Sequence, residues 1–185
     1  MKVERYLDIK HTVMEAGHTD DIDWCEDVKP CSCAVDFFLE YLWVVCNSGM
    51  KYEIAQIIYK KILTAIIGHR DVSEVFNHAG KCKSITFVKD NKESLFKQYG
   101  EASDKIAFLS TLPHIGPITK YHLARNLGLD VCKPDRHLER IAGMYDTTPH
   151  ALCDRLAQIT GDRVGTVDIV LWWAGKMGLV TLTQA

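Results

Sequence analysis

Apolar residues recur at three- and four-residue intervals along most of the 185-residue chain, and this spacing is typical of helices that bury one face. The clearest examples are residues 34–46 and 51–67. Between them, Asn47, Ser48 and Gly49 are typical of a helix end followed by a turn. Alternating patterns that would indicate strands are rare. The sequence therefore predicts an all-α protein.

Further stretches carry the same periodicity or begin with residues that favour the first helical turn, such as proline or a capping residue. We expect additional helices at 2–16, 73–88, 92–98, 103–112, 117–127, 134–145, 148–160 and 166–177. Residues 84–88 give the best strand pattern, but helix is preferred there. Residues 17–33 are acidic, contain cysteines and are interrupted by Pro30, so we expect a linker there that is ordered only by packing on the rest.

The net charge of −2 is unevenly distributed along the chain. Residues 1–40 carry 4 basic and 10 acidic side chains, residues 41–140 carry 15 and 10, and residues 141–185 carry 3 and 4. A polyanion would be attracted to the middle segment and repelled by the first one. A solvated basic face with no ligand explains the same pattern, so charge alone leaves both interpretations open.

Other global features favour a cytoplasmic protein. No apolar run approaches the roughly 20 residues that span a bilayer, and the first ten residues lack the features of a secretory signal, so we expect no membrane partner. Seven scattered cysteines form a poor disulfide framework. The spacing of Cys25, Cys31 and Cys33 fits neither zinc nor iron-sulfur patterns, so ordinary thiols are the preferred interpretation.

The segment Leu112-Pro113-His114-Ile115-Gly116-Pro117 lies between two amphipathic helical stretches. We interpret it as a helix-hairpin-helix, a tight turn in which an unsubstituted glycine lets a phosphate approach the backbone and free amides point toward that anion. Such a turn would hold nucleic acid without reading bases. By itself this pattern is weak evidence, because prolines and glycines punctuate any helical protein.

Together with the next segment, the chain resembles the helix-hairpin-helix DNA glycosylase superfamily. Residues 112–128 are similar to the family's L-P-G-V-G hairpin and the helix after it. Residues 135–141, DRHLERI, are similar to the D-x-H-[IL]-x-R-[IV] run of the endonuclease III branch. Residues 130–135, DVCKPD, are similar to the D-V-F-x-P-D segment of the alkyladenine branch. The match is strong over about 30 residues and looser over about 150.

The resemblance implies a two-lobed helical fold with a cleft between the lobes. Residues 34–130 would form a central lobe with the hairpin at about 103–128, and residues 1–33 plus 131–185 would form the second lobe. It also implies that Asp135 is the catalytic carboxylate, which would stabilise the positive charge that develops on deoxyribose and orient the attacking water. The alternative is that Asp135 is only a first-turn residue favoured by the helix dipole.

The resemblance also implies a set of DNA contacts. These are His114, Ile115, Gly116, Ile118, Lys120 and Arg125 in and after the hairpin, and Arg136 and His137 after the aspartate. By a weaker correspondence, Asn47, Ser48 and Met50 would wedge into the minor groove, although a plain turn explains them equally. The candidates for a pocket that holds the extruded base are Tyr41, Trp43, Tyr52 and Trp172, each of which could instead be a core residue. Trp172 and Trp173 cannot face the same way on one helix, which leaves one of them for a ligand.

Several departures from the family pattern refine the expectation. Ile118 stands where lyase members carry the lysine that attacks the sugar, so we expect a monofunctional enzyme that uses water. Lys120 and Lys133 lie close enough in sequence to act as the attacking lysine, so a lyase remains an alternative. His114 replaces the first hairpin glycine, although histidine tolerates left-handed backbone angles better than β-branched residues do. The four-cysteine loop is absent, so no iron-sulfur cluster is expected. The family implies a monovalent cation at the hairpin carbonyls and requires no organic cofactor.

The sequence thus predicts a monomeric, monofunctional DNA glycosylase that acts on double-stranded DNA in the cytoplasm, and in the nucleoid if the source is prokaryotic. The alternatives are a catalytically silent helix-hairpin-helix module and a bifunctional glycosylase/lyase. The base that is excised, the opposite-base preference and the role in repair or in defence against foreign DNA stay open.

Overall fold

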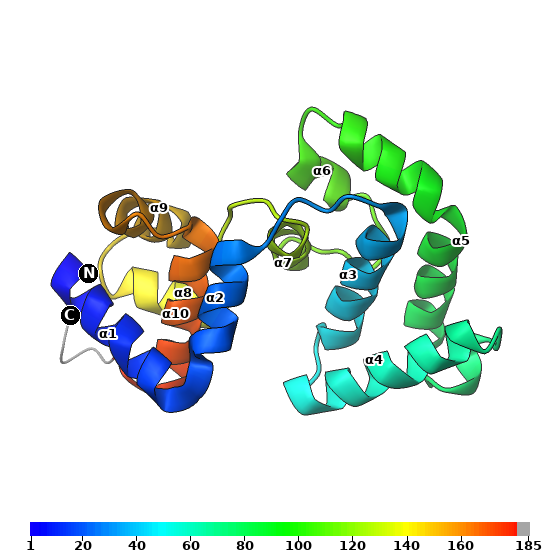
Figure 1. The fold of residues 1–185 in the computed structure, drawn as a ribbon, viewed down its shortest axis with the longest axis horizontal. Coiled ribbons are helices and arrows are strands. Elements are labelled where there is room, and N and C mark those ends of the chain that lie inside the picture. The colour runs from blue at the N-terminus through cyan, green and yellow to red at the C-terminus, as the bar shows by residue number, and fades with distance from the viewer. Residues whose placement is uncertain (181–185) are drawn as a thin grey trace. The chain divides into compact units, whose positions relative to one another are not determined.

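The computed structural model describes residues 1–180, and every regular element in this range is helical (Figure 1). Within these residues no strand occurs, which confirms the prediction of an all-α protein. Contacts along the chain divide it into two compact units. Unit 1 consists of Met1–Lys29 with the residues from Gly128 onward, and unit 2 is Pro30–Leu127. The boundaries expected from sequence were 33/34 and 130/131. No described helix has the length and apolar character needed to cross a membrane.

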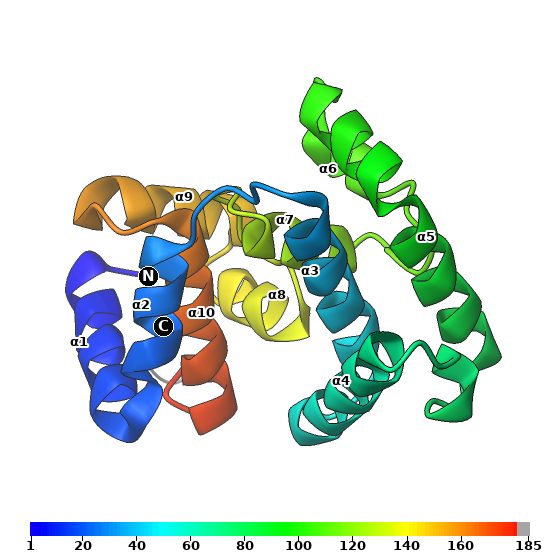
Figure 2. The ribbon, with the colours of Figure 1, turned by 45° about the vertical axis from the view of Figure 1, so that its right-hand side comes forward.

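Unit 1 is organised around its last helix, α10, which contacts four other helices of the unit. Its elements are α1 (Val3–Val13), the π-helix η1 (Met14–His18), α2 (Thr19–Asp27), α8 (Arg136–Gly143), α9 (Pro149–Thr160) and α10 (Val164–Met177). Figure 2 shows α2 and α10 side by side. The core between these helices contains Ile9, Leu138, Ile141 and Leu171, all at most 1% exposed. Burial of such side chains contributes about 1.5–3 kcal/mol each to folding.

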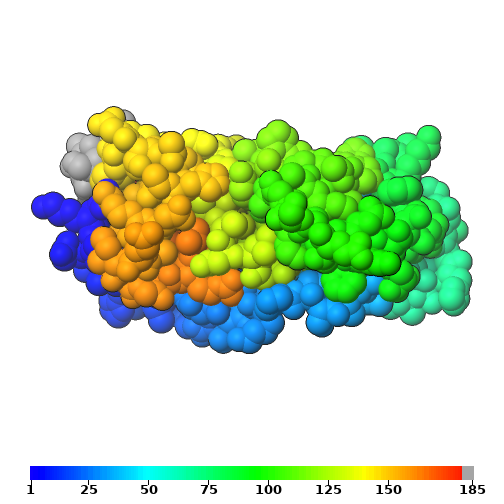
Figure 3. Space-filling model, turned by 90° about the horizontal axis from the view of Figure 1, so that it is seen from above, coloured from blue at the N-terminus to red at the C-terminus, as the bar shows by residue number. Residues whose placement is uncertain are grey.

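The N-terminal helix packs on residues that are more than 150 positions later in the chain. The hydroxyl of Tyr6 donates to Asp162 Oδ2 at 2.6 Å, and Lys10 Nζ donates to Asp162 Oδ1 at 2.7 Å. The guanidinium of Arg155 donates to the carbonyl of Met1 at 2.7 Å. Figure 3 shows the blue N-terminal residues beside the orange residues of α9. These bonds fix α1 to the C-terminal half of unit 1.

The expectation of a linker at residues 17–33 is wrong for most of that segment. Residues 19–27 form α2, which packs on α10 and buries Ile22 and Cys25. The acidic residues that suggested a linker lie on the solvent side, while these two residues, three apart, face the core. Within this segment, Gly17 with a φ of 91°, His18 with a φ of −104°, and the residues after Asp27 depart from helical geometry.

Arg163 joins the two segments of unit 1 that lead to unit 2. Its guanidinium donates to the carbonyls of Val28 at 2.8 Å and Gly128 at 3.0 Å. Its Nε lies 3.6 Å from Asp130 Oδ1, which also accepts the backbone N–H of Gly165 at 3.1 Å. One side chain therefore holds the chain where it leaves unit 1 and where it returns.

Unit 2 packs around α3, whose residues Phe37, Tyr41 and Leu42 are fully buried. Its elements are α3 (Ala34–Asn47), α4 (Tyr52–Ile67), the 3-10 turn η2 (Val72–Glu74), α5 (Ala79–Glu101), α6 (Lys105–Leu109) and α7 (Thr119–Asn126). Helix α3 contacts α4, α5 and α7.

The separate helices expected at 73–88 and 92–98 are instead one helix of 23 residues, α5. Its start is set by His78, whose Nδ1 accepts the backbone N–H of Lys81 at 3.2 Å. Residues 89–91, between the two expected helices, are polar and mostly exposed, and Asn91 donates to the carbonyl of Phe87 at 2.8 Å. An exposed polar run is compatible with a continuous helix when the opposite face is buried, as Ile85 and Val88 are here.

Candidate functional site

Asp135 is the N-cap of α8. Its backbone is extended, with φ −86° and ψ 174°, and its Oδ1 accepts the backbone N–H groups of His137 at 2.9 Å and Leu138 at 3.3 Å. The other oxygen, Oδ2, lies 3.3 Å from the ammonium of Lys133. The aspartate side chain is 17% exposed. The carboxylate is therefore held by the helix end and by one cation, and part of it faces solvent.

The loop that carries Asp135 is anchored to α10. The backbone N–H of Lys133 donates at 2.8 Å to Oδ2 of Asp168, a buried residue of α10. Pro134 is buried, and the N–H of Asp135 donates to the carbonyl of Lys133 at 2.7 Å. This anchoring fixes the position of the carboxylate relative to α8 and α10.

Basic and aromatic side chains surround the first turn of α8. A Cβ at Gly175 would lie 3.4 Å from both Cβ and Nδ1 of His137, so α8 and α10 approach closely here. Burial lowers the pKa of His137 below its usual 6.5, and the charges of Arg136, Arg140 and Lys176 lower it further, while Asp135 opposes the shift. Arg136, Arg140 and Lys176 therefore all contribute positive charge to the surface next to Asp135.

The two adjacent tryptophans of α10 have different surroundings. Trp173 stacks on His18 with ring centroids 3.4 Å apart, and its indole N–H donates to Asp21 at 2.9 Å. Trp172 is half-buried and meets the ring of His137 edge to face at 6.3 Å. The ammonium of Lys176 lies 4.6 Å from the centroid of Trp172. The Trp172 ring is therefore covered by Lys176 and bordered by His137, and it shares unit 1 with Asp135.

The other three base-pocket candidates lie in unit 2. The ring of Trp43 meets the rings of Tyr52 at 5.6 Å and Tyr59 at 5.7 Å, both edge to face, between α3 and α4. Tyr52 is 48% exposed. Tyr41 is fully buried, and its hydroxyl donates to the carbonyl of Pro113 at 2.8 Å, so it supports the hairpin and has no face open to a ligand.

The hairpin turn connects α6 to α7. His114 has a φ of 58°, the left-handed conformation that a glycine would occupy at this position. Its side chain is exposed, whereas Ile115 is buried and contributes to the core rather than to an outer surface. Ile118 is 40% exposed. A Cβ at Gly116 would meet only Thr119 Oγ1, at 3.9 Å, so the backbone there is open to a close approach.

Of the hairpin amides expected to face an anion, that of Gly116 is not free, because its N–H donates to Thr119 Oγ1 at 2.7 Å. The N–H groups of Lys120 and Tyr121 donate to the carbonyls of Gly116 and Ile118. Within the described hairpin, the amides left without an acceptor are those of His114, Ile118 and Thr119. Thr119 was not predicted from the sequence, although a threonine three residues after a turn residue is a recognised local bonding pattern.

The carbonyls of the hairpin offer little to a cation. Those of Leu112, Pro113 and Gly116 accept hydrogen bonds from Ile115, Tyr41 and Lys120, respectively. The three that remain, of His114, Ile115 and Pro117, are fewer than the roughly six oxygens that hard cations take, so waters or a phosphate would have to complete the shell. These three carbonyls are the ones that would hold the monovalent cation implied by the family.

The basic residues after the hairpin differ in accessibility. Lys120 is half-buried with its ammonium 5.2 Å from the Tyr121 ring. Arg125 is only 7% exposed. Little of the Arg125 side chain is therefore open to a phosphate, and its role as a DNA contact stays a prediction. Arg136 is exposed, and Arg140 donates to the carbonyl of Gly175 at 3.4 Å.

The wedge candidates lie in a tight turn at the end of α3. The N–H of Met50 donates to the carbonyl of Asn47 at 3.2 Å, and Gly49 has a φ of 74°. The ammonium of Lys81, which is 7% exposed, donates to the carbonyl of Ser48 at 2.7 Å. Burial lowers the pKa of Lys81, while the Cys46 thiol opposes that shift. No local pattern in the sequence indicates this lysine, because its partner is 33 positions away in the chain.

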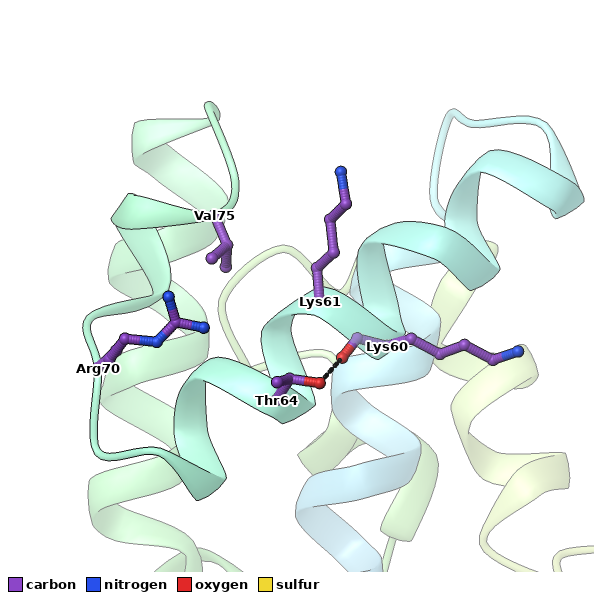
Figure 4. Close-up of a pocket in the computed structure, with 5 residues that line it drawn as sticks. All are labelled: Lys60, Lys61, Thr64, Arg70 and Val75. Carbon is purple, nitrogen blue, oxygen red and sulfur yellow. Dashed lines mark hydrogen bonds between the residues drawn. The ribbon is translucent and has the colours of Figure 1, made fainter.

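A separate hollow on unit 2 is lined by Lys60, Lys61, Thr64, Arg70 and Val75 and contains about 420 Å³ of space, part of it open solvent (Figure 4). Figure 4 shows the side chain of Arg70 pointing toward Val75 and that of Lys60 pointing away from both. The cationic side chains that line the hollow therefore do not converge on a position where one anion could bind. None of the predicted site residues lines the hollow.

The cysteines are free thiols in the structure. Cys25 belongs to unit 1, whereas Cys31 and Cys33 belong to unit 2, where Cys33 Sγ accepts the N–H of Asp36 at 3.4 Å and caps α3. Across residues 1–180, no group of three or more His, Cys, Asp or Glu side chains could hold a metal ion.

Comparisons of the chain with models of protein families, with curated proteins and with solved structures found no match. The chemistry available to the chain is therefore judged from its motifs and from the described residues. A partly exposed carboxylate, fixed at a helix end and flanked by cations and an aromatic ring, can stabilise positive charge that develops on a bound sugar.

Proposed function

We propose that the chain is a monofunctional DNA glycosylase that extrudes a damaged, mismatched or modified base from double-stranded DNA and hydrolyses its glycosidic bond. The observation that carries the proposal is Asp135, because both of its oxygens are held while the side chain keeps contact with solvent. A carboxylate used only as a cap needs neither the paired cation, Lys133, nor the anchored loop.

The reaction needs little more than this carboxylate and water. As the bond between the base and C1′ breaks, the base leaves with the bonding electrons and positive charge develops on the sugar. Asp135 stabilises that charge, and water adds to C1′ while giving a proton to the carboxylate. At about 4 Å and an effective dielectric near 20, such a charge pair contributes roughly 4 kcal/mol, which is about a thousandfold in rate.

The hairpin supplies the contact with the DNA backbone in this proposal. The amides of Ile118 and Thr119 are available for a phosphate, and His114 and Lys120 lie on the same short segment. These contacts are electrostatic and independent of sequence, so binding weakens steeply as salt is raised. The resemblance to the glycosylases supports this role, and the protein is proposed to act as a monomer.

A second candidate is a bifunctional glycosylase/lyase. The observation that favours it is the ammonium of Lys133, 3.3 Å from the carboxylate that would take its proton. In that mechanism Nζ bonds to C1′, the base leaves, and the opened sugar remains as an imine that borohydride reduces to a stable amine. Because the ammonium is already occupied by Asp135, we prefer the water mechanism.

The test is incubation with duplexes that carry alkylated, deaminated, oxidised or naturally hypermodified bases, followed by alkali. Strand breaks that appear only after alkali support hydrolysis. Breaks without alkali, together with a borohydride-trapped adduct that Lys133→Ala abolishes, support the lyase. DNA binding with no release of any base would leave the silent helix-hairpin-helix module as the function.

A further inference from the structure

The first turn of α5 is bonded to the turn at residues 47–50. His78 is the N-cap of α5, and its Nδ1 accepts the backbone N–H of Lys81 at 3.2 Å. The side chain of the same lysine donates from Nζ to the carbonyl of Ser48 at 2.7 Å. Ser48 ends α3 and belongs to the turn at residues 47–50. One residue, Lys81, therefore joins His78 to that turn.

His78 also contacts the hairpin. Its ring meets that of His114 edge to face, with centroids 6.0 Å apart and an interplanar angle of 88°. Aromatic rings attract one another in this arrangement at roughly 4.5–7 Å. A Cβ at Gly80 would lie 3.3 Å from His114 Nε2 and 3.7 Å from His78 Cε1, so both rings border this glycine. The missing side chain at Gly80 therefore leaves the room in which the hairpin histidine packs on α5.

His78 is fixed by its backbone as well as by its ring. Its carbonyl accepts the N–H of Cys82 at 2.9 Å, and its own N–H donates to the carbonyl of Phe76 at 3.0 Å. The ring of Phe76, a buried residue, lies 5.9 Å from the imidazole. The ring that His114 contacts is therefore held to the first turn of α5 rather than being a loose surface side chain.

We propose that His78 is a positioning residue that links the hairpin to the turn at residues 47–50. The contacts run from the His114 ring to the His78 ring, through the capped N–H to Lys81, and from its ammonium to Ser48. Chains of packed rings and hydrogen bonds of this kind carry energetic coupling between sites. The family's hairpin has a glycine in place of His114, so the resemblance does not imply this link. Its effect on base extrusion rests on the proposed function, whereas the link itself rests on these contacts.

The link is tested first in the DNA-free protein, by two-dimensional ¹H–¹⁵N NMR of the backbone amides of residues 47–50. The perturbation is His114→Gly, which removes the ring, while glycine adopts the φ of 58° at this position without strain. We expect His114→Gly to shift the signals of Ser48 and Gly49, and to shift them at least about threefold less in a His78→Asn background. Equal shifts in the two backgrounds, or none in either, would overturn the proposal.

The substitution His78→Asn separates the ring contact from the cap, because asparagine is itself a good N-cap. The matched control is Thr148→Ala in unit 1, because Thr148 also accepts, at 3.2 Å, the N–H of a residue three positions ahead, Ala151. Thr148→Ala should leave the signals of residues 47–50 unchanged. If His78 acted only as a cap, His78→Asn would behave as the wild type in every measurement, and that result would contradict the positioning role.

The second measurement uses duplex DNA with 2-aminopurine beside the target base. His78→Asn should reduce base extrusion about threefold or more while duplex affinity changes by less than about twofold. The double variant with Lys81→Met should extrude no less than Lys81→Met alone, because both substitutions break one link. Additive losses would contradict the link. Because the NMR test needs no DNA, a His78-dependent shift in a protein that releases no base would refute only the glycosylase, and base release without that shift would refute only the link.

Discussion

The ammonium of Lys133 lies 3.3 Å from Oδ2 of Asp135, and the backbone N–H of the same lysine donates to Asp168 on α10. One residue thus connects the candidate catalytic carboxylate to the central helix of unit 1. The lysine side chain is 19% exposed, so solvent screens this pair less than it screens a fully exposed one. We expect the pair to act mainly by holding the carboxylate in place.

Replacing Lys133 by methionine should lower the rate of base release about tenfold, because the carboxylate loses one of its fixed partners and samples other orientations. DNA affinity should change less than twofold, and the free energy of unfolding should fall by about 0.5–1 kcal/mol. Single-turnover release measures the rate. The control is Lys89→Met, which removes the exposed pair of Lys89 with Asp90 at 3.2 Å. An unchanged rate in Lys133→Met would show that the pair does not support catalysis.

The imidazole of His137 should make unit 1 sensitive to mild acid. Burial and the charges of Arg136, Arg140 and Lys176 lower its pKa in the folded protein, and only Asp135 opposes them. The unfolded chain therefore takes up a proton near pH 6.5 before the folded one does, and stability falls as the pH drops from 6.5 through the lowered pKa. Urea unfolding at pH 7.5 and pH 5 should show a larger loss for the wild type than for His137→Gln. A control substitution at exposed His11 should retain the wild-type loss, and equal losses for wild type and His137→Gln would contradict the prediction.

Thr119 should be required for the shape of the hairpin. Its hydroxyl accepts the N–H of Gly116 at 2.7 Å, and Thr119→Val removes this acceptor while keeping the side-chain shape. We expect a loss of about 1 kcal/mol in stability and a several-fold loss of duplex affinity at low salt. Thr119→Ser should restore both. Fluorescence anisotropy with a labelled duplex measures the affinity, and tighter binding by Thr119→Val would mean that the released amide of Gly116 is itself a phosphate ligand.

Lys81 should control the turn that contains Asn47, Ser48 and Met50. Its buried ammonium donates to the carbonyl of Ser48, the end of α3, where a cation also complements the helix dipole. Lys81→Met should leave duplex affinity nearly unchanged but reduce base extrusion several-fold, read from the fluorescence of 2-aminopurine placed beside the target. The control is Lys83→Met on the exposed side of α5. Normal extrusion by a folded Lys81→Met protein would remove the wedge role from this turn.

The sequence predicted the elements whose periodicity and end signals agree. Residues 148–160 are a good case, because Thr148 accepts the N–H of Ala151, Pro149 fits the first turn, and Gly161 takes the left-handed conformation that ends α9. The linker expected at residues 17–33 is wrong because the acidic residues there lie on the exposed face of a helix whose other, short face is buried. The break expected inside α5 failed because exposed polar residues there bond within the helix.

For the candidate site, sequence spacing located the residues but not their partners. The motif around Asp135 identified a carboxylate at a helix start, and the structure adds that the same residue caps the helix. Contacts such as Lys81 with Ser48, or Lys133 with Asp168, join residues more than 30 positions apart, and nothing in local sequence indicates them. The burial of Arg125 could not be predicted from the sequence either. A basic residue at this place after the hairpin is typical of a phosphate contact, whether its side chain points outward or inward.

The most direct measurement of the central claim is single-turnover base release by wild type, Asp135→Asn and Asp135→Ala on one duplex substrate. Asparagine caps helices about as well as aspartate, so Asp135→Asn should keep the wild-type stability, whereas Asp135→Ala should lose about 1 kcal/mol. Both variants should bind the duplex, and both should release base roughly a thousandfold more slowly than wild type. Release by Asp135→Asn at the wild-type rate would show that this residue is only a helix cap.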